Sequence, residues 1–259
     1  MDGREFVERR VLVTGAGAGI GRAITSAFVS EGAWVAAVDK VAERVSDVTA
    51  ALSGGPGRVV GVVGDIRTSS AVERIVSEAT GALGRIDVLV NNAAMYPNCP
   101  VVEMDEEQWD AVIDTNLKGT FLMSRAVARW MLAQRNEGHV ISIASGAYRS
   151  ARLGASHYCA SKAGIVMFSK VLAQELAAHR IHVNVVSPGL IDAGPRGGNP
   201  AYRETLVKSI PWGRPGQPSE IADAVLFLAS RRAEYITGTV IDVDGGSSAG
   251  RFFLPYSRA

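Results

Sequence analysis

Ser145, Tyr158 and Lys162 are residues whose types and spacing could move a proton. Ser145 follows the apolar run 139–144, which predicts a strand, while Tyr158 and Lys162 stand four residues apart at the start of a helical pattern. Residues four apart share one face of a helix, so the phenol and the ammonium are expected to lie close together. A nearby cation favours the phenolate and lowers a tyrosine pKa that is ordinarily about 10. Such a tyrosine can give and take the proton that accompanies a hydride moving on or off a carbon.

A Tyr and a Lys at helical spacing are more often a solvated pair, so this chemistry requires a hydride carrier elsewhere in the chain. A glycine-rich turn near the amino end could bind one, because it lies between a predicted strand at 10–14 and a helical pattern at 22–28. Glycine lets the backbone turn tightly and approach a pyrophosphate closely. The helix then offers unpaired N–H groups and its positive dipole end to that anion. The spacing is Gly-x-x-x-Gly-x-Gly rather than the common Gly-x-Gly-x-x-Gly. The expected contacts with a dinucleotide are Gly15, Ala18, Gly19, Ile20 and Gly21.

Acidic residues after the next two predicted strands could hold the adenosine part of the dinucleotide. Asp39 ends the second strand, where an acid accepts hydrogen bonds from a ribose. Its charge would repel a 2′-phosphate, so the sequence predicts NAD rather than NADP, although Lys40 beside it weakens the repulsion. Asp65 and Ile66 follow the third strand and are expected at the adenine. The alternative role of Asp65 is a helix N-cap.

Together these segments resemble the short-chain dehydrogenase/reductase superfamily, in particular its one-domain group with a Tyr-x-x-x-Lys motif. The matches run in order along almost the whole chain. They are Thr14-Gly15-x-x-x-Gly19-Ile20-Gly21, Asn91-Asn92-Ala93-Ala94 with Ala94 in place of the usual glycine, the set Asn116, Ser145, Tyr158 and Lys162, then Pro188-Gly189, and Asp242-Val-Asp244-Gly245-Gly246.

The resemblance implies a role for each catalytic residue. Tyr158 would transfer the proton, Ser145 would hold the substrate oxygen, and Lys162 would lower the tyrosine pKa and hydrogen-bond the nicotinamide ribose. Asn116 would distort its helix slightly and hold a water that completes a proton path from Lys162 to solvent. Without the family, Asn116 would be taken as a polar surface position. The remaining expected cofactor contacts are Asn92, Ala93, Pro188, Gly189 and Ile191.

The stretch after Pro188-Gly189 departs from the family pattern. The family often has a threonine four residues after that glycine, where it contacts the nicotinamide or the phosphates, whereas this chain has Ala193. We therefore expect the cofactor carboxamide to be held mostly by backbone groups such as those of Ile191.

Length and composition limit the kind of protein. The 259 residues suffice for one large α/β domain with a sizeable core. Hydrophobic residues make up 47% and the net charge is +1, which gives no electrostatic case for binding nucleic acid or an acidic membrane. Two cysteines make no disulfide framework, and four histidines without a His/Cys cluster argue against a metal site. No secretory signal or bilayer-spanning run is visible, so the expected location is the cytoplasm.

Strand and helix patterns alternate almost to the end of the chain. Further helical patterns lie at 42–52, 69–83, 106–135, 156–178 and 218–229. The alternation predicts an α/β fold of Rossmann type, a doubly wound parallel sheet of about seven strands with helices on both faces. We expect a single NAD(P)-binding domain over 1–259. Ligands of such sheets bind at the carboxyl ends of the strands.

Two segments depart from this alternation. The stretch of about 190–218 is rich in proline and glycine, and it is expected to be a long loop with one short helix near 201–210. Long loops inside compact domains often act as lids, so we expect it to close over the substrate. Residues 247–259 are expected to form a C-terminal tail.

Residues near the expected catalytic group suggest the substrate. The candidate pocket residues are Ser145, Ala147, Tyr148, Leu153, Met95 and Tyr96. Their mainly apolar and aromatic character favours a hydrophobic or cyclic secondary alcohol and its ketone. Four arginines could instead attract an anionic substrate, an alternative of lower weight because charged loop residues are usually solvated. They are Arg149, Arg152, Arg196 and Arg203.

The resemblance also implies an assembly of several copies. In the family two long helices, here 106–135 and 156–178, commonly pack between subunits. The chain also ends in an apolar cluster, where disorder is the default. The cluster consists of Phe252, Phe253, Leu254 and Tyr256. We expect it to pack on a neighbouring subunit, in a homotetramer.

Three functions are compatible with these observations. The first is an NAD-dependent secondary-alcohol dehydrogenase acting on a small molecule. The second is an NADPH-dependent 3-oxoacyl-carrier-protein reductase, against which Asp39 and the lack of a basic residue at Ala16 or Ala18 argue. The third is a catalytically silent NAD-binding regulator, a class that usually loses part of the Ser/Tyr/Lys set that this chain keeps. Epimerase or dehydratase chemistry on a nucleotide-sugar normally needs a longer chain.

Overall fold

Seven parallel strands form one sheet in the order β3-β2-β1-β4-β5-β6-β7. The computed structural model describes residues 4–194 and 200–250, with the backbone alone for 200–203. The strands are β1 (Arg10–Thr14), β2 (Trp34–Asp39), β3 (Arg58–Val63), β4 (Val88–Asn91), β5 (Gly138–Ile143), β6 (Ile181–Pro188) and β7 (Val240–Val243). The central strands are buried on both faces, which is why they are almost continuous hydrophobic runs.

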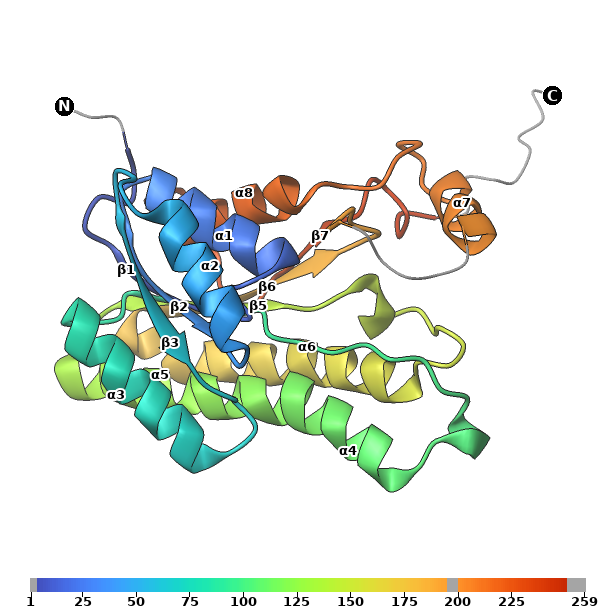
Figure 1. Ribbon diagram of the computed structural model, residues 1–259, viewed down its shortest axis with the longest axis horizontal. Helices are drawn as coiled ribbons and strands as arrows, with labels where there is room; N and C mark the ends of the chain where they lie inside the picture. The colour runs from blue at the N-terminus through green and yellow to red at the C-terminus, as the bar shows by residue number, and fades with distance from the viewer. Residues whose placement is uncertain (1–3, 195–199, 251–259) are drawn as a thin grey trace.

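Helices cover both faces of this sheet (Figure 1). One face carries α1, α2 and α8, and the opposite face carries α3, α4, α5 and α6. The bounds are α1 (Gly19–Ser30), α2 (Ala42–Leu52), α3 (Ser69–Leu83), α4 (Glu106–Ile113), α5 (Gly119–Gln134), α6 (Ser156–Leu176), α7 (Pro200–Lys208) and α8 (Pro218–Ala229). The predicted doubly wound α/β fold with a seven-stranded sheet is therefore confirmed.

Two hydrophobic cores, one on each face, hold the helices to the sheet. Successive side chains of a strand point to opposite faces, so Val11 and Val13 of β1 belong to the core under α1, together with Phe28. Leu12 between them belongs to the core under α5, together with Met123. Burying one such side chain stabilises the fold by about 1.5–3 kcal/mol. The sheet is thereby a rigid platform for whatever lies at its carboxyl edge.

The helical stretch 106–135 is distorted at the position of Asn116, where the sequence analysis expects a distortion. It consists of α4, a π-helical turn at Asp114–Lys118, and α5, which begins at Gly119. Its start is well defined, because Asp105 and Gln108 form a reciprocal capping box. A π-helical turn inserts one extra residue into a helix and frequently marks a functional site.

The connection from β6 to β7 changes face. The helix α8 packs on α1, whereas α6, which connects β5 to β6, lies on the other side of the sheet (Figure 1). The strand order nevertheless continues in one direction from β5 through β6 to β7. The last connection therefore has the opposite hand to the one before it, against the usual right-handed preference.

Residues 190–217, the first part of this connection, include the expected lid. Ile191 and Gly216 form an isolated parallel bridge at its base. The N–H of Asp192 donates to the carbonyl oxygen of Gly216 at 2.8 Å, and the N–H of Gly216 donates to that of Leu190 at 2.9 Å. The expected short helix is present as α7. The two ends of the segment are thus fastened together beside the end of β6.

Two expectations fall on residues outside those described. Residues 195–199 of the expected lid, which include Arg196, and the aromatic tail 251–259 belong to this group. Within 4–194 and 200–250, no helix has the length and apolarity needed to cross a membrane.

Candidate active site

The glycine-rich turn between β1 and α1 leaves room for a ligand because it carries almost no side chains. Gly15 has a φ of +63°, and a Cβ built on Gly21 would lie 2.0 Å from the carbonyl oxygen of Gly15. Ala18 is the N-cap of α1 and makes no side-chain cap, so the first N–H groups of the helix stay available for a ligand. These features fit the pyrophosphate of a dinucleotide, which needs close backbone approach and the end of a helix.

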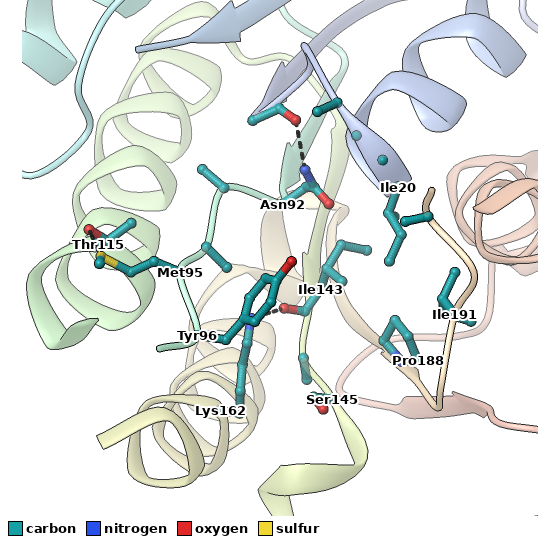
Figure 2. A pocket seen from close by; sticks show the side chains of 18 of the residues that line it. Ile20, Asn92, Met95, Tyr96, Thr115, Ile143, Ser145, Lys162, Pro188 and Ile191 are labelled. Carbon is teal, nitrogen blue, oxygen red and sulfur yellow. Dashed lines mark hydrogen bonds between the residues drawn. The ribbon is translucent and has the colours of Figure 1, made fainter. Parts of the chain in front are cut away.

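Asn92 fastens this turn to the end of β4. Its side-chain Nδ2 donates to the carbonyl oxygens of Thr14 at 3.0 Å and Gly15 at 3.1 Å (Figure 2). In return the Thr14 hydroxyl accepts from the backbone N–H groups of Asn92 at 3.0 Å and Ala93 at 3.2 Å. The shape of the turn is therefore fixed from the neighbouring strand.

Asp39 faces the same turn from the end of β2. Its carboxylate accepts from the N–H of Gly17 at 3.2 Å and from that of Val41 at 3.1 Å, and the residue is buried. This arrangement places a fixed acceptor where the ribose of an adenosine is expected. Lys40 and Arg44 line the cavity beside it, so two cations stand close to the position of a 2′-phosphate.

Asp65 lines the cavity next to Asp39 but has a cationic partner. Its Oδ2 lies 2.8 Å from a guanidinium nitrogen of Arg67. Partial burial raises the pKa of Asp65, but the hydrogen bonds and charge of Arg67 outweigh that effect, and the pKa ends below its ordinary value. The helix α3 is capped by Thr68, whose hydroxyl accepts from the N–H of Ala71. The alternative role of Asp65 as the cap is therefore wrong.

One cavity of about 680 Å³ extends from the glycine turn to α6 along the carboxyl ends of the strands (Figure 2). It brings together most of the residues predicted to form the site. Those in its wall are Gly15, Ala18, Gly19, Ile20, Gly21, Asp39, Asp65, Ile66, Asn92, Ala93, Met95, Tyr96, Ser145, Tyr158, Lys162, Pro188, Gly189 and Ile191. Asn116, Ala147, Tyr148 and Leu153 are outside it.

Lys162 reaches the cavity from the buried side of α6. Its Nζ donates to the carbonyl oxygen of Ile143 at 2.7 Å and lies 5.7 Å from the centroid of the Tyr158 ring (Figure 2). The residue is only 3% exposed. Burial disfavours the ammonium and lowers the pKa of Lys162 to about 7. At neutral pH this side chain can therefore both hold and release a proton.

The pKa of Tyr158 shifts in the direction opposite to the one that the sequence predicts. Burial of the phenol raises its pKa, and the hydrogen bond with Ser145 and the charge of Arg152 lower it by less. The expectation that Lys162 lowers this pKa is therefore wrong. Lys162 is turned to Ile143 and is itself easily deprotonated, so its cationic influence is weak.

Asn116 lies at the centre of the π-helical turn and is fully buried, so it is not the polar surface position that the residue type alone suggests. Its Oδ1 accepts from the N–H of Met95 at 2.8 Å, and its Nδ2 donates to the Met95 carbonyl at 2.9 Å and to Ser161 at 3.1 Å. Ser161 in turn donates to the carbonyl oxygen of Tyr158 at 2.7 Å. The expected distortion of the helix is present, while the expected water remains a prediction.

The side of the cavity where the nicotinamide is expected is formed by the end of β6 and the start of the segment 190–217. Gly189 packs so closely on Asp244 that a Cβ would lie 2.7 Å from the Asp244 Cα. Ile191 and Ala193 follow in the wall. A Cβ on Gly19 would lie 3.4 Å from that of Ala193. The position where the family often has threonine therefore faces the glycine turn.

The substrate end of the cavity differs in part from the expectation. Tyr96 packs edge-on against Tyr158 with 6.2 Å between ring centroids, and Met95 lies beside it. The predicted Ala147 and Tyr148 belong to a short 3₁₀ turn after Ser145 and do not line the cavity. Leu153 is 98% exposed and does not line the cavity.

Several lining residues were not predicted from the sequence. They are Thr115, Leu190, Leu206 and Arg44. Leu190 and Leu206 lie in the segment expected to be a lid, which was the only signal that they could reach the site. Among the described residues, no group of three or more His, Cys, Asp or Glu side chains is placed to hold a metal ion.

A dinucleotide-type turn and a tyrosine–lysine pair in one cavity define a nicotinamide-dependent oxidoreductase class, and comparisons with known proteins agree. Residues 15–248 match the family described as enoyl-(acyl carrier protein) reductase. The chain is 42% identical to 3-oxoacyl-[acyl-carrier-protein] reductase FabG of Thermotoga maritima, over 91% of this chain and 96% of that protein. It is 40% identical to D-threitol dehydrogenase of Mycolicibacterium smegmatis, over 91% of each.

A solved structure gives the same result for the fold. A short-chain type dehydrogenase/reductase from Mycobacterium marinum superposes with a TM-score of 0.88 at 34% identity, covering 95% of this chain and 98% of that one. The chain therefore belongs to the short-chain dehydrogenase/reductase family.

Proposed function

We propose that this protein is an NAD-dependent oxidoreductase that transfers a hydride between NAD and a secondary alcohol or its ketone. The observation that supports this most is the position of Tyr158, Ser145 and Lys162 in the wall of the cavity that begins at the glycine turn. NAD would supply or accept the hydride. The apolar side chains of Met95 and Leu206 favour a substrate with a hydrophobic or cyclic body.

The protein's own groups would handle the proton and the substrate oxygen. The raised pKa of Tyr158 keeps the phenol protonated at rest, ready to donate to the oxygen of a ketone. Ser145 would hold the same oxygen and stabilise the charge that develops on it. Lys162 has a pKa of about 7, so its Nζ would take up or release a proton near neutral pH.

The proposal of NAD rests on Asp39. Its carboxylate is fixed by the N–H groups of Gly17 and Val41, in a position to accept from ribose hydroxyls and to repel a phosphate. Lys40 and Arg44 reduce this repulsion, so the preference for NAD is expected to be moderate.

A second candidate is the NADPH-dependent reduction of a 3-oxoacyl group on a carrier protein. It is favoured by the 42% identity to the Thermotoga maritima reductase and by the two cations beside Asp39. A catalytically silent NAD-binding regulator has less support, because the catalytic set is complete in this chain.

The test is reduction of NAD and of NADP, side by side, with secondary alcohols, diols, polyols and 3-hydroxyacyl thioesters. The control is Tyr158→Phe, which removes the proton donor and keeps the ring. We expect turnover with NAD on one class of alcohol and a loss on the order of 10³-fold in the control. NAD binding, measured by calorimetry, should be nearly unchanged.

Each other outcome has a definite meaning. A preference for NADP on the thioester would replace the first candidate by the second. Retained turnover in Tyr158→Phe would sink the proposed mechanism. NAD binding with no turnover of any compound in the panel would favour the silent regulator.

We also propose a homotetramer and a cytoplasmic location. The outer faces of α5 and α6 expose apolar side chains, among them Phe121, Met167 and Val171, as helices that pack between subunits would. Light scattering of the whole chain and of a chain ending at residue 250 tests this assembly and the part played by the tail. A monomeric mass for the whole chain would contradict it.

A further inference from the structure

The sequence offers four arginines as partners of an anionic substrate, and the structure shows which of them can reach the cavity. Arg149 is already paired, because its guanidinium lies 2.9 Å from Asp242 and 3.9 Å from Asp244. Arg196 and the side chain of Arg203 are outside the described residues. Arg152 lines the cavity together with Tyr158. Of the arginines whose side chains are described, it is the one directed at the substrate end.

Two loops hold Arg152 in that place. Its Nη2 donates to the Oδ1 of Asn98 at 3.0 Å, and its carbonyl oxygen accepts from the N–H of Ala155 at 3.2 Å. The backbone of the two loops is joined as well, because the N–H of Cys99 donates to the carbonyl oxygen of Gly154 at 2.7 Å. The guanidinium is thus positioned before a ligand arrives, which reduces the entropy lost on binding.

The partner of Arg152 is neutral, so its charge is not cancelled. Asn98 supplies an amide oxygen and takes one of the five N–H donors of a guanidinium. The acidic residues in the described wall of the cavity are Asp39 and Asp65, which lie after β2 and β3 at the other end. Asp65 also has its own partner, Arg67.

The charge of Arg152 is felt at the reacting residue. It is one of the influences that lower the pKa of Tyr158, after the hydrogen bond from Ser145. Because Arg152 and Tyr158 line the same cavity, a group bound by Arg152 would share that cavity with the substrate oxygen that Tyr158 is proposed to protonate. Lys162, the other cation beside this tyrosine, is buried and donates to a backbone carbonyl.

We propose that Arg152 binds an oxyanion, a carboxylate or a phosphate, carried by the substrate a few bonds from the reacting carbon. A guanidinium presents two parallel N–H donors that match such a group, and it keeps its charge at any working pH. The inference rests on the proposed function and narrows its substrate to an alcohol or ketone with an anionic end. The apolar wall formed by Met95, Leu190 and Leu206 would contact the remaining carbon skeleton.

Matched ketones test this inference. The first pair is 4-oxopentanoate and its methyl ester, and the second is hydroxyacetone phosphate and hydroxyacetone, so that the two oxyanions are compared separately. Steady-state reduction is measured with NADH and NADPH. We expect kcat/KM to be higher for the anionic member of one pair by on the order of 10- to 100-fold, the usual worth of a hydrogen bond to a charged group.

The variants are Arg152→Met, Arg152→Lys and Asn98→Ala. The first should remove the preference for the anion, so that the charged and uncharged members of a pair are reduced with similar kcat/KM. Arg152→Lys keeps the positive charge but lacks the two parallel N–H donors, so it should keep part of the preference for the anion. The third removes the anchor and should give an intermediate loss. Arg149→Met is the matched control, because it deletes an arginine of the same loop that is already paired.

The outcomes distinguish the inference from the function on which it rests. Equal rates for charged and uncharged members, unchanged by Arg152→Met, would overturn the inference and leave the oxidoreductase in place. An equal loss for both members of a pair would assign Arg152 to the loop structure instead. If no ketone is reduced with either coenzyme while other compounds of the alcohol panel are oxidised, the substrate has no such anion and the inference also fails. Absence of turnover with every compound would remove the proposed function.

Discussion

The two ends of the cavity are held in different ways. At the cofactor end, formed by the turns after β1, β2 and β4, partly buried backbone and amide groups hold one another, as in the bonds from Asn92 to Thr14 and Gly15. At the substrate end, formed by the segments 95–99, 145–158 and 190–216, exposed side chains and ion pairs join the loops, as in Arg152 with Asn98 and Arg149 with Asp242.

This difference predicts that the two ends of the cavity tolerate substitution to different degrees. Buried hydrogen bonds are costly to break, because the group left behind loses water as well as its partner. Exposed pairs contribute little, since water and salt compete for both members. The cofactor end is thus expected to tolerate almost no change, and the substrate end to tolerate much. Four predictions test this contrast, from the largest effect to the smallest.

Gly21→Ala should be the most damaging single change. Its Cβ would lie 2.0 Å from the carbonyl oxygen of Gly15, so the turn must shift. We expect a loss of stability on the order of 4 kcal/mol and of NAD binding, measured by urea unfolding and calorimetry. The control is Gly81→Ala in α3, where a Cβ meets nothing within 4 Å, and which should stabilise the helix slightly. Similar results for the two variants would contradict the contrast between these sites.

A buried group at the amino end of β5, away from the cavity, should also be costly to disturb. His139 of β5 is buried and stacks on His182 with ring centroids 4.9 Å apart. Burial lowers the pKa of His139 to about 4, helped by His182 and Arg9 and opposed by Asp87. As the pH falls from 6.5 to 4, the unfolded chain takes up a proton that the folded one does not. Stability should therefore fall by about 3 kcal/mol across that window.

Urea unfolding at a series of pH values measures this effect. The control is His139→Phe, which keeps a ring against His182 but cannot titrate. It should show a flatter dependence between pH 6.5 and 4. An identical slope for the two proteins would mean that other groups cause the loss in acid.

Two asparagines that each hold a loop give a matched comparison of the two ends. Asn92→Ala removes two donors to the backbone of the glycine turn and should cost about 2 kcal/mol. Asn98→Ala removes one bond to the exposed Arg152 and should cost less than about 0.5 kcal/mol. Urea midpoints of both proteins are the measurement, and a reversed order would refute the contrast.

An effect as small as that of Asn98→Ala is expected at the ion pair between Arg149 and Asp242. The two side chains are 34% and 24% exposed, so Arg149→Met should lower stability by about 0.5 kcal/mol. The difference from the native chain should shrink further in 1 M salt, because salt screens such pairs. A loss above 2 kcal/mol that salt does not change would show that the pair works as a buried one.

The sequence predicts the cofactor end well because its determinants are local. A strand, a glycine turn and a helix follow one another directly, and Asp39 ends the strand that comes next. Each residue there is positioned by its immediate neighbours. The positions of Gly15, Gly21 and Asp39 could therefore be deduced from the order of residue types alone.

The substrate end could be predicted only in part, because its determinants are distant in sequence. Asn116 owes its place to Met95 and Ser161, which are 21 and 45 positions away. Leu153 was expected in the pocket because it stands between Ser145 and Tyr158 in the sequence. The direction of a side chain in a loop depends, however, on the residues of other loops that pack against it. The direction of the Tyr158 pKa shift depends on how deeply the phenol is buried, and the spacing of residues in the sequence does not predict that burial.

The connection between β6 and β7 contains a segment whose sequence could change without disturbing the sheet. Ile191 and Gly216 pair with each other, so the segment between them begins and ends at the same place. Substitutions inside this segment therefore remove no strand from the sheet. Ala193 in this segment faces the glycine turn, whereas residues 204–209 lie on α7 and directly after it. Residues 204–209, which include Leu206, could be randomised in a search for a new substrate specificity while the sheet stays unchanged. The glycine turn after β1 and the helix α7, which carries Leu206, thus belong to separate segments of the chain.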